Sequence, residues 1–279
     1  MQPLEFLKFT PKTNCGECGY AACLAFAAAV TKGGENPGKC PYVDVSLLAG
    51  EFAMADPGNG TLSGVDRLLD EKDMALVAHL KGKIREVDFP EIAPKLGCAW
   101  SGPETNILSF RYLGREVTLS GEGIFIGGKE AEEPRDQILL YNYIFYGGGA
   151  ASSGSWVGME SLPNSISKVR TLRVYCEERI ANYFCGKVAL LRECAGKIDA
   201  EPRDHQEPGC SAAFQVAVLP RLPMLLLFWD EDREEGFPPR VKILYDQNVL
   251  DVLDIESLIF ASERMAECLE AVAKQPCHF

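Results

Sequence analysis

The pattern of apolar and polar residues changes near residue 60. Residues 1–60 lack the two-residue alternation of strands, whereas apolar positions recur at helical spacing over residues 65–80. Between these stretches, residues 56–60 read DPGNG, a cluster of helix- and strand-breaking residues that predicts a linker. We therefore expect two domains, residues 1–60 and residues 63–279.

Beyond the expected linker the pattern mixes strand-like and helical segments. Residues 106–113 and 115–120 predict a hairpin that turns near Gly114. Further strands are expected at residues 124–126, 213–219, 224–229 and 241–245. The PRLP sequence between two of them predicts a turn, because proline cannot donate a hydrogen bond to a strand ladder.

Helical periodicity marks the other segments, at residues 134–146, 165–184, 187–195 and 255–273. Asn164 is expected to open the second of these helices, and Gly196 to stop the third. Because strands and helices do not alternate regularly, we expect an α+β fold. It would comprise a small, mainly helical domain followed by a larger mixed α+β domain with a largely antiparallel sheet.

The composition is that of an ordinary globular protein, with 279 residues, 47% hydrophobic and 24% charged. A formal charge of −12 argues against nucleic acid as a partner. The longest strongly apolar run, residues 222–229, is too short for a membrane span. The N-terminal sequence lacks the pattern of a secretory signal, so we expect a cytoplasmic protein whose eleven cysteines stay reduced.

Four cysteines fall in the segment TNCGECGYAACLAFAAAVTKGGENPGKCP. Cys15, Cys18, Cys23 and Cys40 have the spacing C-x2-C-x4-C-x16-C, and Pro41 follows the last. Four thiolates hold either Zn(II) or an iron–sulfur cluster. A zinc ribbon would offer two short C-x-x-C knuckles. Three crowded cysteines and a lone fourth before proline favour a four-iron cubane instead.

The residues between these cysteines agree with a cluster site. Gly16 and Gly19 let the loop bend tightly and direct backbone N–H groups toward sulfur. Residues 21–31 predict a helix that ends at the glycines of residues 33–34. Cys23 would lie in the first turn of this helix, where the positive end of the helix dipole favours a thiolate.

Residues 10–45 resemble the short four-iron four-sulfur domain of the corrinoid iron–sulfur protein large subunit, the gamma subunit of acetyl-CoA decarbonylase/synthase. The same type of domain occurs in the B subunit of ion-translocating ferredoxin oxidoreductases. The resemblance rests on the four cysteines, Gly16, Gly19 and the Cys-Pro end. It implies that Cys15, Cys18, Cys23 and Cys40 ligate one [4Fe-4S] cluster that passes single electrons.

Residues 63–279 are similar to the DUF3786 family, often found in anaerobes behind such an iron–sulfur segment. The similarity rests on QILLYNYIFYGGG, GSWVGMESLP and LPRLPMLLLFWDEDREEGFPPRVKILYD. That family has no settled activity to transfer, so no catalytic residue is assigned. The barrel and cobamide-binding patterns of the corrinoid protein are not recognised here. A corrinoid or other tetrapyrrole therefore has no support from these residues.

Seven cysteines remain, of which Cys176, Cys185 and Cys194 are spaced by nine. On a continuous helix nine residues reverse the face, and Cys176 and Cys194 would lie about 27 Å apart. We expect them to be buried small apolar residues rather than a second metal site.

Other polar groups are expected to be structural. Cys277 and His278 lie at the end of the chain, and Cys210 with His205 is expected in a surface loop. The glycine stretches at residues 121–128 and 147–149 predict turns and a helix stop. The acidic residues within 230–235 predict a solvated loop.

Three functions agree with these features. The favoured one is an electron-transfer protein whose cluster exchanges low-potential electrons with a redox protein partner, a ferredoxin-like donor or an acceptor enzyme. The second is a reductive enzyme or cofactor-binding protein whose larger domain holds the substrate. The third is a binding module in which the four cysteines hold a structural metal.

Overall fold

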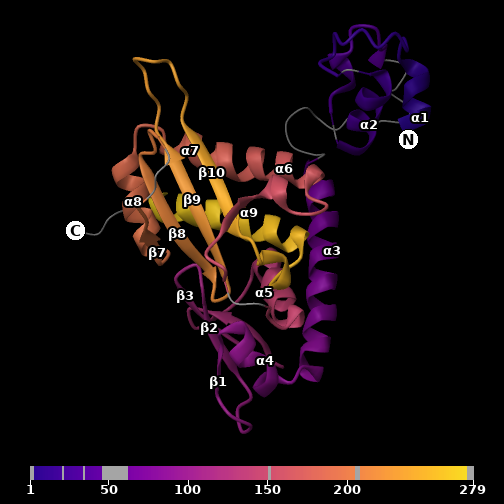
Figure 1. Ribbon diagram of the computed structural model, residues 1–279. Coiled ribbons are helices and arrows are strands. Elements are labelled where there is room, and N and C mark those ends of the chain that lie inside the picture. Colours follow the sequence, from indigo (N-terminus) through magenta and orange to yellow (C-terminus); the bar gives the residue numbers. More distant parts are fainter. Residues whose placement is uncertain are drawn as a thin grey trace. The chain divides into compact units, whose positions relative to one another are not determined.

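The computed structural model describes residues 3–20, 22–33, 35–45, 62–149, 152–204 and 208–274 (Figure 1). The chain divides into two compact units, residues 1–72 and residues 73–279. The boundary falls within helix α3 (Leu62–Lys83). The linker predicted at residues 56–60 lies outside the described residues.

The first unit is small and mainly helical, as the sequence predicts. It contains α1 (Pro3–Phe6), the 3-10 turn η1 (Leu7–Phe9), α2 (Cys23–Gly33) and the 3-10 turn η2 (Pro37–Lys39). Its core is a cluster of six buried residues: Phe6, Phe26, Ala27, Val30, Cys40 and Val43. The rings of Phe6 and Phe26 meet edge to face with centroids 6.0 Å apart, which joins α1 to α2.

The second unit contains two antiparallel sheets, which confirms the predicted α+β fold. The first sheet follows chain order through β1 (Ala99–Trp100), β2 (Leu108–Tyr112), β3 (Arg115–Ser120), β4 (Gly123–Ile126) and β5 (Lys129–Glu130). The second has the order β6 (Trp156–Gly158), β10 (Arg240–Asp246), β9 (Leu222–Trp229), β8 (Ala212–Leu219) and β7 (Ala200–Pro202).

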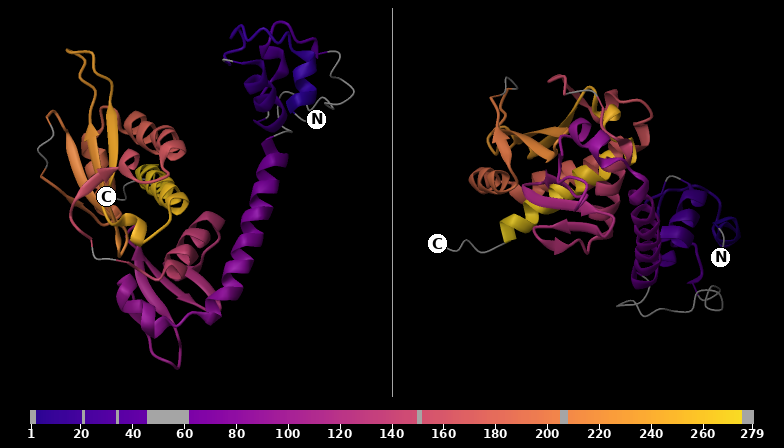
Figure 2. Two further views of the ribbon diagram at one scale, coloured as in Figure 1. Left: turned by 45° about the vertical axis from the view of Figure 1, so that its right-hand side comes forward. Right: turned by 90° about the horizontal axis from the view of Figure 1, so that it is seen from below.

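Short and long helices connect and cover these sheets: η4 (Ile84–Glu86), α4 (Phe89–Leu96), α5 (Pro134–Tyr146), η5 (Met159–Ser161), α6 (Ile166–Leu172), the π-helical η6 (Arg173–Glu177), α7 (Glu178–Phe184), α8 (Val188–Lys197), η7 (Val249–Asp251) and α9 (Ile255–Lys274). Helices α6, α7 and α9 lie along one face of the second sheet (Figures 1 and 2). The hydroxyl of Ser262 on α9 contacts Met224 Sδ on β9. Because side chains alternate along a strand, Leu225 and Leu227 of β9 face away from α9.

Several predicted boundaries need correction. Helix α6 is preceded by Ser165 and not by the predicted Asn164. Asn164 takes a left-handed conformation with φ of 58°, which keeps it outside the helix. Gly196 does not stop α8, which continues to Lys197. The left-handed residue that reverses the chain there is Asp199.

The prediction that both prolines of the PRLP sequence lie in a turn is correct for one of them and wrong for the other. Pro220 lies in the turn, but Pro223 lies inside β9 opposite Ala217. The register between β8 and β9 shifts between Ala217 and Leu219. An irregular ladder tolerates a residue that has no N–H to donate.

Within the described residues, the helices are all too short or too polar to cross a membrane.

Candidate metal centre

The four predicted ligands lie on three consecutive segments of the first unit. Cys15 and Cys18 belong to the loop between η1 and α2, Cys23 is the first residue of α2, and Cys40 directly follows η2. Cys15 is exposed and Cys18 half-buried, whereas Cys23 and Cys40 are buried. All four are thiols rather than disulfides.

Left-handed residues shape the loop that carries Cys15 and Cys18. Asn14, Gly16 and Gly19 have φ values of 52°, 79° and 84°. The N–H of Gly19 donates to the carbonyl of Gly16 at 2.9 Å, which closes a tight turn around Cys18. Among the described residues, nothing lies within 4 Å of where a Cβ would stand on Gly16 or Gly19. Glycine is therefore required at both positions by the backbone angle and not by crowding.

A side-chain cap ties this loop to α2. The Oδ1 atom of Asn14 accepts a hydrogen bond from the backbone N–H of Cys23 at 2.8 Å. The first N–H groups of a helix have no partner within it, so this bond fixes both the start of α2 and the position of Cys23. The sequence pattern does not reveal the role of Asn14, because it precedes the helix by nine residues and matches no local capping pattern.

Further hydrogen bonds join the segment that carries Cys40 to the loop. The hydroxyl of Tyr42 donates to Glu17 Oε1 at 3.0 Å, and Glu17 stands between the first two cysteines. The hydroxyl of Tyr20 donates to Glu35 Oε2 at 2.8 Å. Together with the cap from Asn14, these bonds hold the three cysteine-bearing segments in one region of the unit.

Glu35 is the centre of the second contact. The ammonium group of Lys39 and the hydroxyl of Tyr20 both donate to it, and these hydrogen bonds lower the pKa of Glu35 to about 2. Its carboxylate in turn raises the pKa of Tyr20. Glu35 is thus a carboxylate at neutral pH and holds the loop just before Cys40 in place.

The thiols themselves do not form a ready coordination sphere. Among the described residues, no group of three or more His, Cys, Asp and Glu side chains is arranged to hold a metal ion. The donor set fits a cluster in its chemistry and in the hydrogen bonds that bring its segments together.

The remaining cysteines are mostly packing residues. Cys176 and Cys194 are fully buried in the core of the second unit, as predicted, and Cys98 and Cys268 pack against that core. The prediction is wrong for Cys185, which is only half-buried because it lies at the end of α7. Burial raises the pKa of Cys98 to about 12 and also raises the pKa of Cys176 and Cys268. Such thiols stay protonated at neutral pH, so they are poor metal ligands.

The other candidates from the sequence take structural positions or fall outside the described residues. His205, Cys277 and His278 are outside them. Cys210 is half-buried with Sγ 3.2 Å from the carbonyl oxygen of Ala212. The acidic loop after β9 is largely exposed at residues 232–235, as predicted. Gly147 ends α5 in a left-handed conformation, again as predicted.

Comparison with protein families places the larger unit. The model described as "Domain of unknown function (DUF3786)" matches residues 88–268, more than half of the chain. The chain belongs to the DUF3786 family. A second model, described as "Putative Fe-S cluster", matches residues 11–42 and so contains all four cysteines. This match, together with a relative that is named an iron-sulfur protein, identifies this DUF3786 chain as an iron–sulfur protein.

The curated relatives match a short part of the chain. The chain is 51% identical over 39 residues to the acetyl-CoA decarbonylase/synthase complex subunit gamma 2 of Methanosarcina thermophila. It is 47% identical over 55 residues to the corrinoid/iron-sulfur protein large subunit of Moorella thermoacetica. These matches cover 14% and 19% of this chain but only 8% and 12% of the relatives.

A third relative extends further along the chain. The B subunit of the ion-translocating oxidoreductase complex of Shewanella loihica is 28% identical over 88 residues, which covers 32% of this chain and 39% of the relative. No solved structure matches the chain.

Proposed function

We propose that Cys15, Cys18, Cys23 and Cys40 ligate a single [4Fe-4S] cluster and that the protein transfers electrons one at a time. The observation that carries the proposal is a set of three hydrogen bonds that joins the cysteine-bearing segments. In these, Asn14 accepts from the N–H of Cys23, and the hydroxyls of Tyr42 and Tyr20 donate to carboxylates. The match of residues 11–42 to an iron–sulfur model supports it. So does the identity with subunits of redox complexes.

When bound, the cluster supplies a one-electron redox centre. The protein's own residues set its surroundings. Cys23 and Cys40 are buried and limit access of water on their side, while the exposed Cys15 marks the side open to a partner. Glu17, between two ligands, places a carboxylate close to the site, which disfavours addition of an electron and lowers the reduction potential.

We also propose a protein partner in anaerobic metabolism, a low-potential donor of the ferredoxin kind or an acceptor enzyme. Relatives that share the segment have the names of complex subunits, which supports association with other proteins. A cofactor held by the larger unit is the alternative acceptor.

A redox titration of protein purified without oxygen, followed by electron paramagnetic resonance, tests the proposal. We expect a reversible one-electron signal with a midpoint at or below about −400 mV. Cys23→Ser should abolish the signal or change its shape, because it removes a buried ligand. Cys98→Ser, which changes a cysteine outside the site, should leave it unaltered. An irreducible centre, or equal effects of the two substitutions, would contradict the proposal.

A structural metal is the second candidate, favoured by the size of the first unit's core. Only six residues form that cluster among the described residues, and so small a core needs a further link between its segments. Zinc bound without labile sulfide would establish this alternative.

A further inference from the structure

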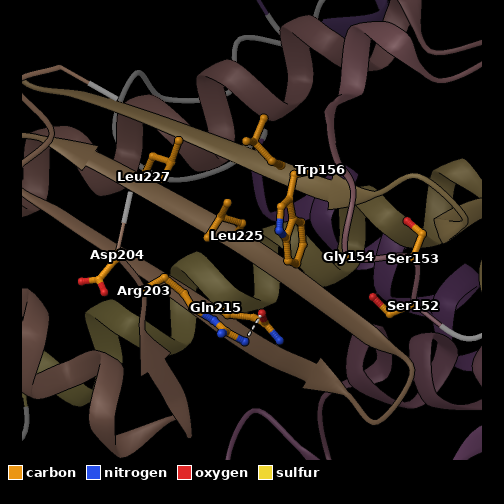
Figure 3. A pocket seen from close by; sticks show the side chains of 10 residues that line it. Ser152, Ser153, Gly154, Trp156, Arg203, Asp204, Gln215, Leu225 and Leu227 are labelled. Carbon is orange, nitrogen blue, oxygen red and sulfur yellow. Dashed lines mark hydrogen bonds between the residues drawn. The ribbon is translucent and has the colours of Figure 1, made fainter. Parts of the chain in front are cut away.

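The face of the second sheet opposite α9 holds a trough. On β9, Leu225 and Leu227 face away from α9, and Leu225 pairs directly with Leu244 of β10. Trp156 of the edge strand β6 stands beside Leu225 (Figure 3). These side chains line a cavity of about 790 Å³, a volume in the range of small-molecule sites.

One end of the trough carries hydrogen-bond donors. The backbone N–H of Arg203 donates to Ala213 at 3.0 Å, which holds Arg203 beside β8. Its Nη2 donates to Gln215 Oε1 at 2.6 Å (Figure 3). Because the Gln215 oxygen is used in this bond, its amide N–H groups stay available as donors next to the guanidinium group.

Nearby carboxylates leave the guanidinium group accessible. Glu201 lies 3.6 Å from Arg203 Nη2 on an exposed side chain, too long for a strong ion pair. The carboxylate of Asp204 points away from the guanidinium group in Figure 3. Among the described residues that line the trough, Arg203 carries the positive charge.

The opposite end is a loop that is held by Asp246 and presents acceptors. Asp246 accepts hydrogen bonds from the hydroxyl of Ser152 at 2.6 Å, from the hydroxyl of Ser153 and from the N–H of Gly154. Burial alone would raise the pKa of Asp246, but the hydrogen bonds from Ser152 and from nearby backbone N–H groups hold it at about 2. Since the serine protons are donated to Asp246, the serine oxygens can act only as acceptors, and Ser153 Oγ already accepts from the N–H of Ser155 at 3.1 Å.

We propose that this trough binds a planar, largely apolar organic acid. Its carboxylate would lie on Arg203 and Gln215, and its flat body would cover Leu225 against the indole of Trp156. Leu225, Leu244 and the indole of Trp156 offer apolar surface to a ring system, and a guanidinium with a neighbouring amide is a strong binding group for a carboxylate. A hydroxyl or amine at the far end would donate to the serine oxygens. The site uses residues of the larger unit only and does not depend on the cluster.

Calorimetric titration of the full chain with two matched probes tests the proposal. Anthracene-9-carboxylate has the flat body and the charge, whereas 9-anthracenemethanol has the body alone. We expect the carboxylate to bind one to one. Arg203→Gln should weaken its binding about tenfold and leave that of the alcohol unchanged, because the lost interaction is charge-assisted. Leu225→Asn should weaken both about tenfold.

Two controls make the result specific. Arg233→Gln removes an equal charge from the exposed loop after β9, and the affinity for the carboxylate should not change. Cys15→Ser should also leave it unchanged, which separates this site from the proposed cluster. Should Leu225→Asn fail to fold, Trp156→Phe replaces it, with loss of energy transfer from the indole to bound anthracene as the readout.

Three results would overturn the proposal. They are absence of carboxylate binding, equal affinity for carboxylate and alcohol, and equal losses from Arg203→Gln and Arg233→Gln.

Discussion

At the scale of single residues, the strongest constraint is a buried carboxylate in the larger unit. Asp136 of α5 is 3% exposed and accepts a hydrogen bond from Tyr112 of β2 at 2.6 Å. It also accepts two from the guanidinium group of Arg264 on α9, at 2.8 and 3.0 Å. A buried charge is tolerated only with such partners, so this group joins a strand and two helices in one arrangement.

Arg264→Gln should lower the free energy of unfolding by about 3 kcal/mol, because it leaves the Asp136 charge buried without its main cation. Arg233→Gln, which breaks a pair with Glu231 at the surface, should leave the free energy of unfolding almost unchanged. Urea denaturation followed by circular dichroism measures both. Equal losses would mean that the Asp136 contacts add nothing beyond surface pairing.

Thiol reactivity should separate the cysteines of the two units. Burial raises the pKa of Cys98 from 9.0 to about 12, so it stays a protonated thiol over the whole neutral range. In protein stripped of metal, iodoacetamide should alkylate the exposed Cys15 at pH 8 and spare the buried Cys176 and Cys194. Peptide mass spectrometry reads the pattern. Fast labelling of Cys176 in the folded protein would contradict its burial.

The raised pKa of Cys98 also makes the stability of the protein depend on pH. A pKa that is higher in the folded state means that folding favours the protonated thiol. The contribution of Cys98 is therefore complete below pH 9 and is lost as the pH rises toward 12.

At the scale of elements, the β2–β3 hairpin shows how local sequence and long-range packing combine. Leu113 and Gly114 have φ values of 45° and 77°, the left-handed pair that a tight two-residue turn needs. A Cβ on Gly114 would also come within 3.0 Å of the backbone of Ile198. The turn was predictable from the glycine, but the contact with the chain after α8 was not.

Gly114→Ala should therefore destabilise the protein more than Gly127→Ala does. Both glycines have positive φ, but among the described residues nothing lies within 4 Å of a Cβ on Gly127. Gly127→Ala should cost about 1 kcal/mol for the backbone angle alone, and Gly114→Ala several-fold more because the backbone of Ile198 cannot give way. Urea midpoints of the two variants give the comparison. Equal midpoints would contradict the close contact.

The sequence predicted elements with strong local patterns and missed what distant residues decide. The long strands β8, β9 and β10 were visible from their apolar runs, whereas β6 and β7 have three residues each and no pattern of their own. They pair with β10 and β8 and form the two edges of the second sheet. For the proposed metal centre, the cysteine spacing was the sequence pattern that indicated the ligands. The hydrogen bond from Tyr42 to Glu17 joins residues 25 apart in sequence, so no local pattern predicted it.

At the scale of the whole molecule, the two units differ in core and in charge. The two hydrophobic clusters share no residue. Residues 1–45 contain four lysines and four carboxylates, so the formal charge of −12 belongs to residues 46–279. The acidic character of the chain therefore does not surround the cysteines in sequence, and the low potential that we propose would come from nearby groups such as Glu17.

Removal of the metal should loosen the first unit and leave the second intact. Its core has few buried residues among those described, so we expect the proposed metal to supply much of its stability. After chelation without oxygen, amide hydrogen exchange should speed up over residues 3–45 and stay unchanged over residues 88–268. Faster exchange throughout the larger unit would show that its fold depends on the metal site.

The identity of the bound metal tests the central claim most directly. Protein purified without oxygen should contain about four irons and four acid-labile sulfides per chain, with zinc well below one, as four thiolates around a single cubane require. Cys98→Ser should keep this content, and Cys40→Ser should lose it. One zinc per chain without labile sulfide would contradict the electron-transfer account and make the four cysteines a structural metal site.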